Sequence, residues 1–330
     1  MKNNLLNTEK AIAAYSIIFI HCSFPSLFGI IIDCLARFAV PLFFMISGYY
    51  CYSDDKINLQ KKFSKKIKHI LTLIIISNII YLSWGIIVRL PNKVEIKAWL
   101  ISLISIKSII KLIFFNDFLA IHLWFLFALL NCYIIMVIIN KFNLYKISYF
   151  LIPILLMINI IGTNVLYLLV GPIPCSFRNF LFLGFPFFML GNLMNIKKNV
   201  ISKINNKIIF AFILIGNLLA IFEREITMRK ELYIGSIIVA CFMFILAIKN
   251  NNSFRFAFTE KIGERYSLLI YLLHPIFIEI INKLFIIVNI NKNILCLYGK
   301  PILICIATTL FAWTFYFVLD KIKFKKKIIT

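Results

Sequence analysis

Long apolar runs separated by short basic segments recur along the whole chain. A helix needs about 20 mostly apolar residues to cross the hydrocarbon layer of a bilayer, and the runs approach or reach that length. Ten of them qualify as spans: 9–29, 35–52, 69–89, 119–140, 147–162, 178–194, 208–222, 232–248, 266–286 and 301–319. The pattern predicts an all-α protein, a polytopic membrane helix bundle of about ten transmembrane helices.

One further apolar stretch, about 96–115, does not fit this description. Lys97, Lys107 and Lys111 interrupt it, and counting it as a span would reverse the orientation of every later helix. We therefore expect an amphipathic segment at the outer face of the membrane, within a single domain that covers residues 1–330.

The composition supports a membrane protein, because 62% of the 330 residues are hydrophobic and only 15% are charged. Soluble domains have about half apolar and a quarter charged residues. The net charge of +23 would suggest nucleic-acid binding in a soluble protein, but here the basic residues cluster between apolar runs. With ten spans and a cytoplasmic N-terminus, 23 basic residues lie inside and 13 outside. This asymmetry predicts a bacterial inner-membrane protein with both termini in the cytoplasm, in contact with anionic lipid and without a nucleic-acid partner.

The eight cysteines are scattered singly, with no C-x-x-C pair and no His/Cys spacing typical of a metal site. Most of them fall in apolar runs, where a thiol behaves as a small hydrophobic group. The sequence therefore predicts neither a bound metal nor a disulfide framework.

Few ionisable residues lie within the spans, and each is a candidate for function because a charge inside a bilayer is costly. Lys10 and His21 both belong to the first span. Their spacing places them on one face of a helix, about 16 Å apart along its axis. An anionic donor entering from the cytoplasm past Lys10 toward His21 would suit this arrangement. A snorkelling lysine and a histidine at the outer helix end would also explain it.

The second span carries a more specific pattern, since Arg37–Tyr49 reads R-F-A-V-P-L-F-F-M-I-S-G-Y. A histidine-bearing first span followed by this segment resembles the acyltransferase family 3 membrane proteins. Within that family it is most similar to exopolysaccharide O-acetyltransferases and to the membrane domains of vancomycin-resistance serine racemases. His122–Leu126, Arg178–Gly191 and Ser267–Pro275 follow in the order and approximate spacing of the family.

The resemblance implies transfer of an acyl group, usually acetyl from acetyl-CoA, to a hydroxyl of an envelope glycan or of a small extracytoplasmic acceptor. It also implies that His21 is the essential histidine of the family. Lys10 stands where the family usually has arginine, so the positive charge is kept and the bidentate guanidinium is lost.

Acyl transfer to a hydroxyl requires a base that takes the proton and a group that stabilises the oxyanion. We expect His21, kept neutral by apolar burial, to be the base and an arginine to stabilise the oxyanion or hold an anionic group. A basic loop at 61–68 would join Lys10 in binding acetyl-CoA. The candidates are His21 and Arg37 for catalysis; Lys10, Lys62, Lys65 and Lys66 for acetyl-CoA; and His122, Trp124, Arg178, His274 and Glu279 for the acceptor.

Structural roles compete for several of these residues. His122 and Arg178 are equally suited to the interfacial ends of their spans. His274 could satisfy the backbone carbonyl that Pro275 leaves without an amide donor. Glu279 could orient a histidine or pair with an arginine.

Two other functions remain open on the sequence. A transporter of a small amino acid such as serine is compatible with the resemblance to the racemase membrane domains. Lys10 in place of arginine, and the lack of a strongly acidic partner for His21, favour this alternative. The chain could also be a non-catalytic component of a polysaccharide-export complex, and the sequence leaves open whether it forms a homo-oligomer.

Overall fold

The computed structural model describes residues 3–52, 56–91, 93–106, 108, 119–170, 177–227, 231–250 and 256–322, and every regular element in these ranges is a helix. The described chain forms two compact units whose boundaries fall after residue 50 and within helix α9, after residue 189. The single domain expected over residues 1–330 stays a prediction, and each unit is described here by itself.

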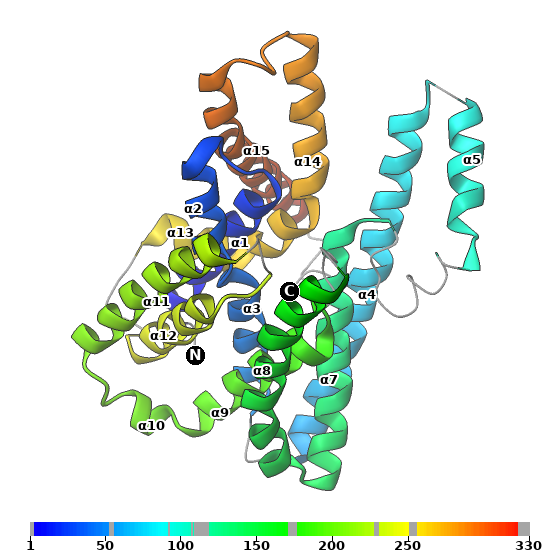
Figure 1. The fold of residues 1–330 in the computed structure, drawn as a ribbon. Coiled ribbons are helices and arrows are strands. Elements are labelled where there is room, and N and C mark those ends of the chain that lie inside the picture. The colour runs from blue at the N-terminus through cyan, green and yellow to red at the C-terminus, as the bar shows by residue number, and fades with distance from the viewer. Residues whose placement is uncertain are drawn as a thin grey trace. The chain divides into compact units, whose positions relative to one another are not determined.

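The first unit holds the chain up to residue 50 and from residue 190 to residue 325 (Figure 1). Its helices are α1 (Asn4–His21), α2 (Ser26–Ala36), α3 (Ala39–Tyr49), the last part of α9 (Phe185–Ile196), α10 (Lys198–Ile201), α11 (Asn206–Ile226), α12 (Ile234–Lys249), α13 (Ala257–Lys261), η3 (Ile262–Tyr266), α14 (Ser267–Ile287) and α15 (Ile294–Lys321). The α1 helix contacts α2, α3, α12, α13, η3, α14 and α15, so it lies at the centre of this unit.

The α1 helix begins earlier and ends earlier than the apolar pattern predicts. The side chain of Asn3 caps it by accepting a hydrogen bond from the Leu6 amide at 2.8 Å, which satisfies one of the free amides of the first turn. The helix ends at His21, and α2 begins at Ser26 after Pro25. The span expected over 9–29 therefore contains a turn, because a proline at this point cannot continue the preceding helix.

The α13, η3 and α14 elements follow one another without a break, and η3 is a π-helical turn. Gly263 lies in this turn against α1: an added Cβ would sit 1.6 Å from the carbonyl oxygen of Asn7. Only glycine permits such a close approach of two backbones. The π-helical turn is thus pressed directly onto the first half of α1.

The second unit contains α4 and α7, which run alongside each other (Figure 1). Its elements are α4 (Lys56–Arg89), α5 (Lys93–Leu103), η1 (Ile121–Leu123), α7 (Trp124–Phe142), α8 (Tyr145–Val170), the π-helical η2 (Phe180–Gly184) and the first part of α9. The expected amphipathic segment at 96–115 is helical as far as Leu103. Its Trp99 ring packs on Gly85 and under the guanidinium of Arg89 at 4.6 Å. Residues 107 and 109–115 of that segment lie outside the described residues.

Seven stretches of helix among the described residues are long and apolar enough to cross a membrane: Ser26–Tyr49, Leu59–Arg89, Ile121–Phe142, Tyr145–Thr163, Asn206–Ile226, Ala257–Ile287 and Ile294–Lys321. Two shorter apolar helices, Phe180–Ile196 and Ile234–Lys249, add to them. The all-helical class and the repeated membrane-length helices are confirmed, while the number ten and the cytoplasmic termini stay predictions.

Candidate functional site

The candidate site of the first unit is centred on two histidines that are far apart in the sequence. His21 is the last residue of α1 and is exposed, whereas His274 lies inside α14 and is fully buried. Their ring centroids are 5.0 Å apart, with the ring planes at 45°. The expected burial of His21 is wrong, because α1 ends at this residue and the chain turns away toward α2. The fold nevertheless places a second imidazole directly beside it.

His274 has a defined orientation that follows from the proline after it. Pro275 has no amide hydrogen, so the carbonyl of Tyr271, one turn earlier, lacks its usual helical donor. The Nδ1 atom of His274 lies 2.7 Å from that carbonyl oxygen. A carbonyl can only accept, so Nδ1 carries the hydrogen and donates it. The predicted contact of His274 with the carbonyl that Pro275 frees is confirmed, and neutral His274 keeps its lone pair on Nε2.

Lys10 lies in the first half of α1, on the same helix as His21, and is half-buried. Its Nζ donates a hydrogen bond of 3.4 Å to the Oδ1 of Asn7. This half of α1 is unusually polar for a buried segment, since Asn4, Asn7 and Thr8 are each less than a tenth exposed. The side chain of Lys10 is therefore held beside a polar strip within the unit.

Glu9 is a buried acidic residue that the sequence interpretation does not single out. Only 2% of the residue is exposed, and neither carboxyl oxygen has a hydrogen-bond partner within the part of the chain that the structure describes. A carboxyl group buried in this way takes up a proton rather than stay ionised, and its polar oxygens without hydrogen bonds still cost free energy.

Replacing Glu9 by methionine is therefore expected to stabilise the protein by about 1 kcal/mol or more, because methionine has a similar size and no buried polar oxygens that lack hydrogen bonds. Thermal unfolding of the detergent-solubilised protein would measure the change. The matched control is Glu264→Met, since Glu264 is exposed and its replacement is expected to leave the melting temperature unchanged. A lower melting temperature for Glu9→Met would contradict this account of the carboxyl group.

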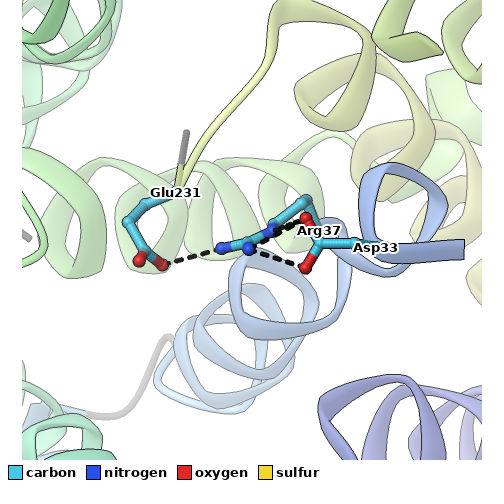
Figure 2. Close-up of polar contacts among 3 residues, drawn as sticks. All are labelled: Asp33, Arg37 and Glu231. Atoms are coloured by element: carbon cyan, nitrogen blue, oxygen red, sulfur yellow. Dashed lines mark hydrogen bonds and ion pairs between the residues drawn. The ribbon is translucent and has the colours of Figure 1, made fainter. Parts of the chain in front are cut away.

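Arg37 is enclosed between two carboxylates, as Figure 2 shows. Its Nη2 lies 2.8 Å from Asp33 Oδ1 and its Nε 3.3 Å from Asp33 Oδ2, while Nη1 lies 3.0 Å from Glu231 Oε2. The Arg37 and Asp33 side chains are 3% and 7% exposed, and that of Glu231 is 37% exposed. This bidentate geometry uses the donor fork of the guanidinium. The ion pairs fix the junction of α2 and α3 to the segment that precedes α12, and the catalytic role expected for Arg37 stays a prediction.

Glu279 belongs to α14, as His274 does. It forms an ion pair of 3.3 Å with Lys283, one turn later on the same helix, and both side chains are well exposed. The cationic partner of Glu279 in this contact is a lysine, and its predicted contact with a histidine or an arginine stays a prediction.

The remaining candidates lie in the second unit. The Trp124 ring packs under the guanidinium of Arg178, with 5.5 Å between the guanidinium carbon and the ring centroid. His122 is buried in η1 and meets the ring of Tyr81 edge-on at 5.1 Å. The structure therefore joins Trp124 to Arg178 through a cation–π contact, which is typically worth about 0.5–2 kcal/mol, and gives His122 an aromatic neighbour.

Lys62, Lys65 and Lys66 form part of α4 and are exposed. The expected basic loop at 61–68 is wrong, because lysine is a good helix former and the charged run continues the helix that begins at Lys56. Their predicted role in binding acetyl-CoA stays a prediction.

The sequence interpretation did not include Asp33, Glu231 or Tyr271 among the site residues. Asp33 could have been found, since it precedes Arg37 by four residues on a helical segment and so lies on the same face. Glu231 comes from a loop far along the chain, and no local pattern indicates it. The pairing of His21 with His274 also depends on tertiary structure alone.

These features define a polytopic, all-helical membrane protein with a histidine pair where its first helix ends. The family model described as the acyltransferase domain matches residues 4–319. The chain therefore belongs to this acyltransferase family and is a membrane acyltransferase. No significant match was found among curated proteins or among solved structures.

Proposed function

We propose that the protein transfers acetyl from cytoplasmic acetyl-CoA to a hydroxyl of an extracytoplasmic acceptor, either an envelope glycan or a small molecule. The observation that carries the proposal is the pair of His21 and His274, with 5.0 Å between their ring centroids. His21 is exposed and can meet a hydroxyl, and the hydrogen bond of His274 to Tyr271 holds the second ring in place.

In this reaction His21 takes the proton of the acceptor hydroxyl while the hydroxyl oxygen attacks the thioester carbonyl. The carbon–sulfur bond then breaks, and the His21 imidazolium returns the proton to the departing thiolate. A general base of this kind typically contributes about 10²–10⁴-fold to the rate. His274 stabilises the imidazolium of His21 through its Nε2 lone pair, in the way that a third group orients the base in other acyl-transfer enzymes.

The donor end of the site is assigned to the first half of α1. Lys10 lies roughly 16 Å from His21 along the helix axis and carries a positive charge suited to a phosphate of acetyl-CoA. The buried Asn7 beside it accepts a hydrogen bond from the Lys10 ammonium and so helps to orient this charge.

The test uses purified protein in proteoliposomes that are supplied with acetyl-labelled acetyl-CoA and oligosaccharides from de-O-acetylated envelope polysaccharide. The wild type is expected to move label into the oligosaccharide, and His21→Ala/His274→Ala is expected to lose this transfer. His69→Ala is the matched control and is expected to keep the acetyl transfer, since His69 belongs to α4 and is not part of the histidine pair. Equal transfer by the double variant and the wild type would refute the proposal. Uptake of labelled serine without any thioester would instead favour the transporter.

A further inference from the structure

The turn between α1 and α2 has a strained backbone that displays aromatic side chains. Ser26 has a φ of 62°, one of three non-glycine residues with positive φ among the described residues. A Cβ added to Gly29 would sit 1.8 Å from the carbonyl oxygen of Phe24. Strain of this kind, typically about 1–3 kcal/mol at one residue, persists when the surrounding structure or a function requires it. The backbone therefore folds tightly at this turn, and the backbone of Phe24 lies against Gly29 near the start of α2.

Three aromatic rings follow one another across this turn and onto α15; we call Phe24, Phe28 and Tyr298 the aromatic ladder. The ring centroids are 5.1 Å apart between Phe24 and Phe28 and 6.2 Å apart between Phe28 and Tyr298. Phe28 is 48% exposed, and a Cβ added to Gly299, next to Tyr298, would meet no atom within 4 Å. The ladder therefore borders open space rather than a packed core.

The ladder begins with Phe24, three residues after His21. The Phe24 ring also contacts the ring of Phe19, with 5.2 Å between centroids. His21 lies in the short segment between these two residues. The turn that carries the aromatic rings thus begins at the residue assigned as the base. A ligand lying on the rings would bring its own groups toward His21.

We propose that the aromatic ladder is the subsite that holds a sugar ring of the acceptor, which makes the substrate a glycan rather than a small alcohol; this inference rests on the proposed function. The faces of aromatic rings are apolar and carry negative partial charge, so they attract the C–H groups on one face of a pyranose. An exposed apolar patch beside polar groups is a common mark of a ligand-binding groove. A belt of aromatic residues at the membrane interface explains exposed rings, but it gives no reason for a strained turn that directly follows His21.

The test measures oligosaccharide binding and acetyl transfer separately, with oligosaccharides from de-O-acetylated envelope polysaccharide as the probe. Phe28→Ala and Tyr298→Ala are each expected to raise the KM for the oligosaccharide about tenfold, since each removes one stacking surface. The KM for acetyl-CoA and the rate with glycerol as acceptor are expected to stay unchanged. Tyr298→Phe is expected to behave as the wild type, because it keeps the ring. Phe222→Ala is the matched control, since Phe222 is 61% exposed on α11 and lies outside the ladder.

Binding of the same oligosaccharides to the His21→Ala protein, followed by saturation-transfer NMR, separates the two proposals. Binding that Phe28→Ala weakens would support the subsite even if the wild type transferred no acetyl group. Equal oligosaccharide affinity for the wild type and for both ladder variants would overturn it. An equal loss in Phe222→Ala would also overturn it, because the effect would then come from contact with lipid.

Discussion

A single His21→Ala substitution is expected to lower the rate of acetyl transfer by about 10²–10⁴-fold while the melting temperature stays the same. The rate falls because the acceptor hydroxyl loses its general base. The fold is unaffected because the His21 side chain is exposed at the last residue of α1, and surface substitutions usually change stability by less than about 0.5 kcal/mol. Steady-state transfer in proteoliposomes and thermal unfolding in detergent measure the two quantities.

The rate of acetyl transfer and the melting temperature report on different properties of His21. A small fall in rate would show that another group takes the proton. A large fall in melting temperature would show that His21 supports the packing of the first unit. His69→Ala again serves as the control for removal of an imidazole from a helix.

Replacing Arg37 by methionine is expected to destabilise the protein by about 3–5 kcal/mol, because it leaves Asp33 buried with an uncompensated charge. The guanidinium makes three hydrogen bonds to Asp33 and one to Glu231, and methionine can replace none of them. Thermal unfolding of the detergent-solubilised protein measures the loss of stability. The double variant Arg37→Met/Asp33→Leu is expected to recover part of it, since both charges of the buried pair are then absent.

Arg37→Met also separates a structural role from the catalytic role expected from the sequence. A variant that unfolds at the wild-type temperature but transfers acetyl slowly would assign Arg37 to the substrate. A less stable variant whose folded fraction keeps the wild-type rate would assign it to holding α2 and α3 against the loop at Glu231.

The periodic and compositional signals in the sequence predicted the helical class, the repeated membrane-length helices and the family. These properties depend on local patterns, since apolar runs form helices and the Arg37–Tyr49 motif is contiguous. The sequence alone does not indicate that His21 is exposed, because the apolar character continues past it to residue 29, whereas the backbone turns before Pro25. The run of lysines at 61–68 is helical rather than a loop, because its helix propensity outweighs its charge.

The contacts that complete the site were not available from local pattern. Arg37 and Glu231 are 194 residues apart, and His274 meets His21 only when α14 packs on α1. By contrast, the contact between His274 and the Tyr271 carbonyl could be predicted, because a proline leaves the carbonyl four residues earlier without its donor.

The π-helical turn η3 sets the direction in which His274 points. A π turn accommodates one residue more than an α turn, so it rotates the rest of the helix by about 100° relative to an uninterrupted α-helix. Residues 262–266 precede α14 directly, and His274 therefore inherits that rotation. The contact between the two imidazoles therefore depends on one additional residue in a turn that lies more than two helical turns away from either ring.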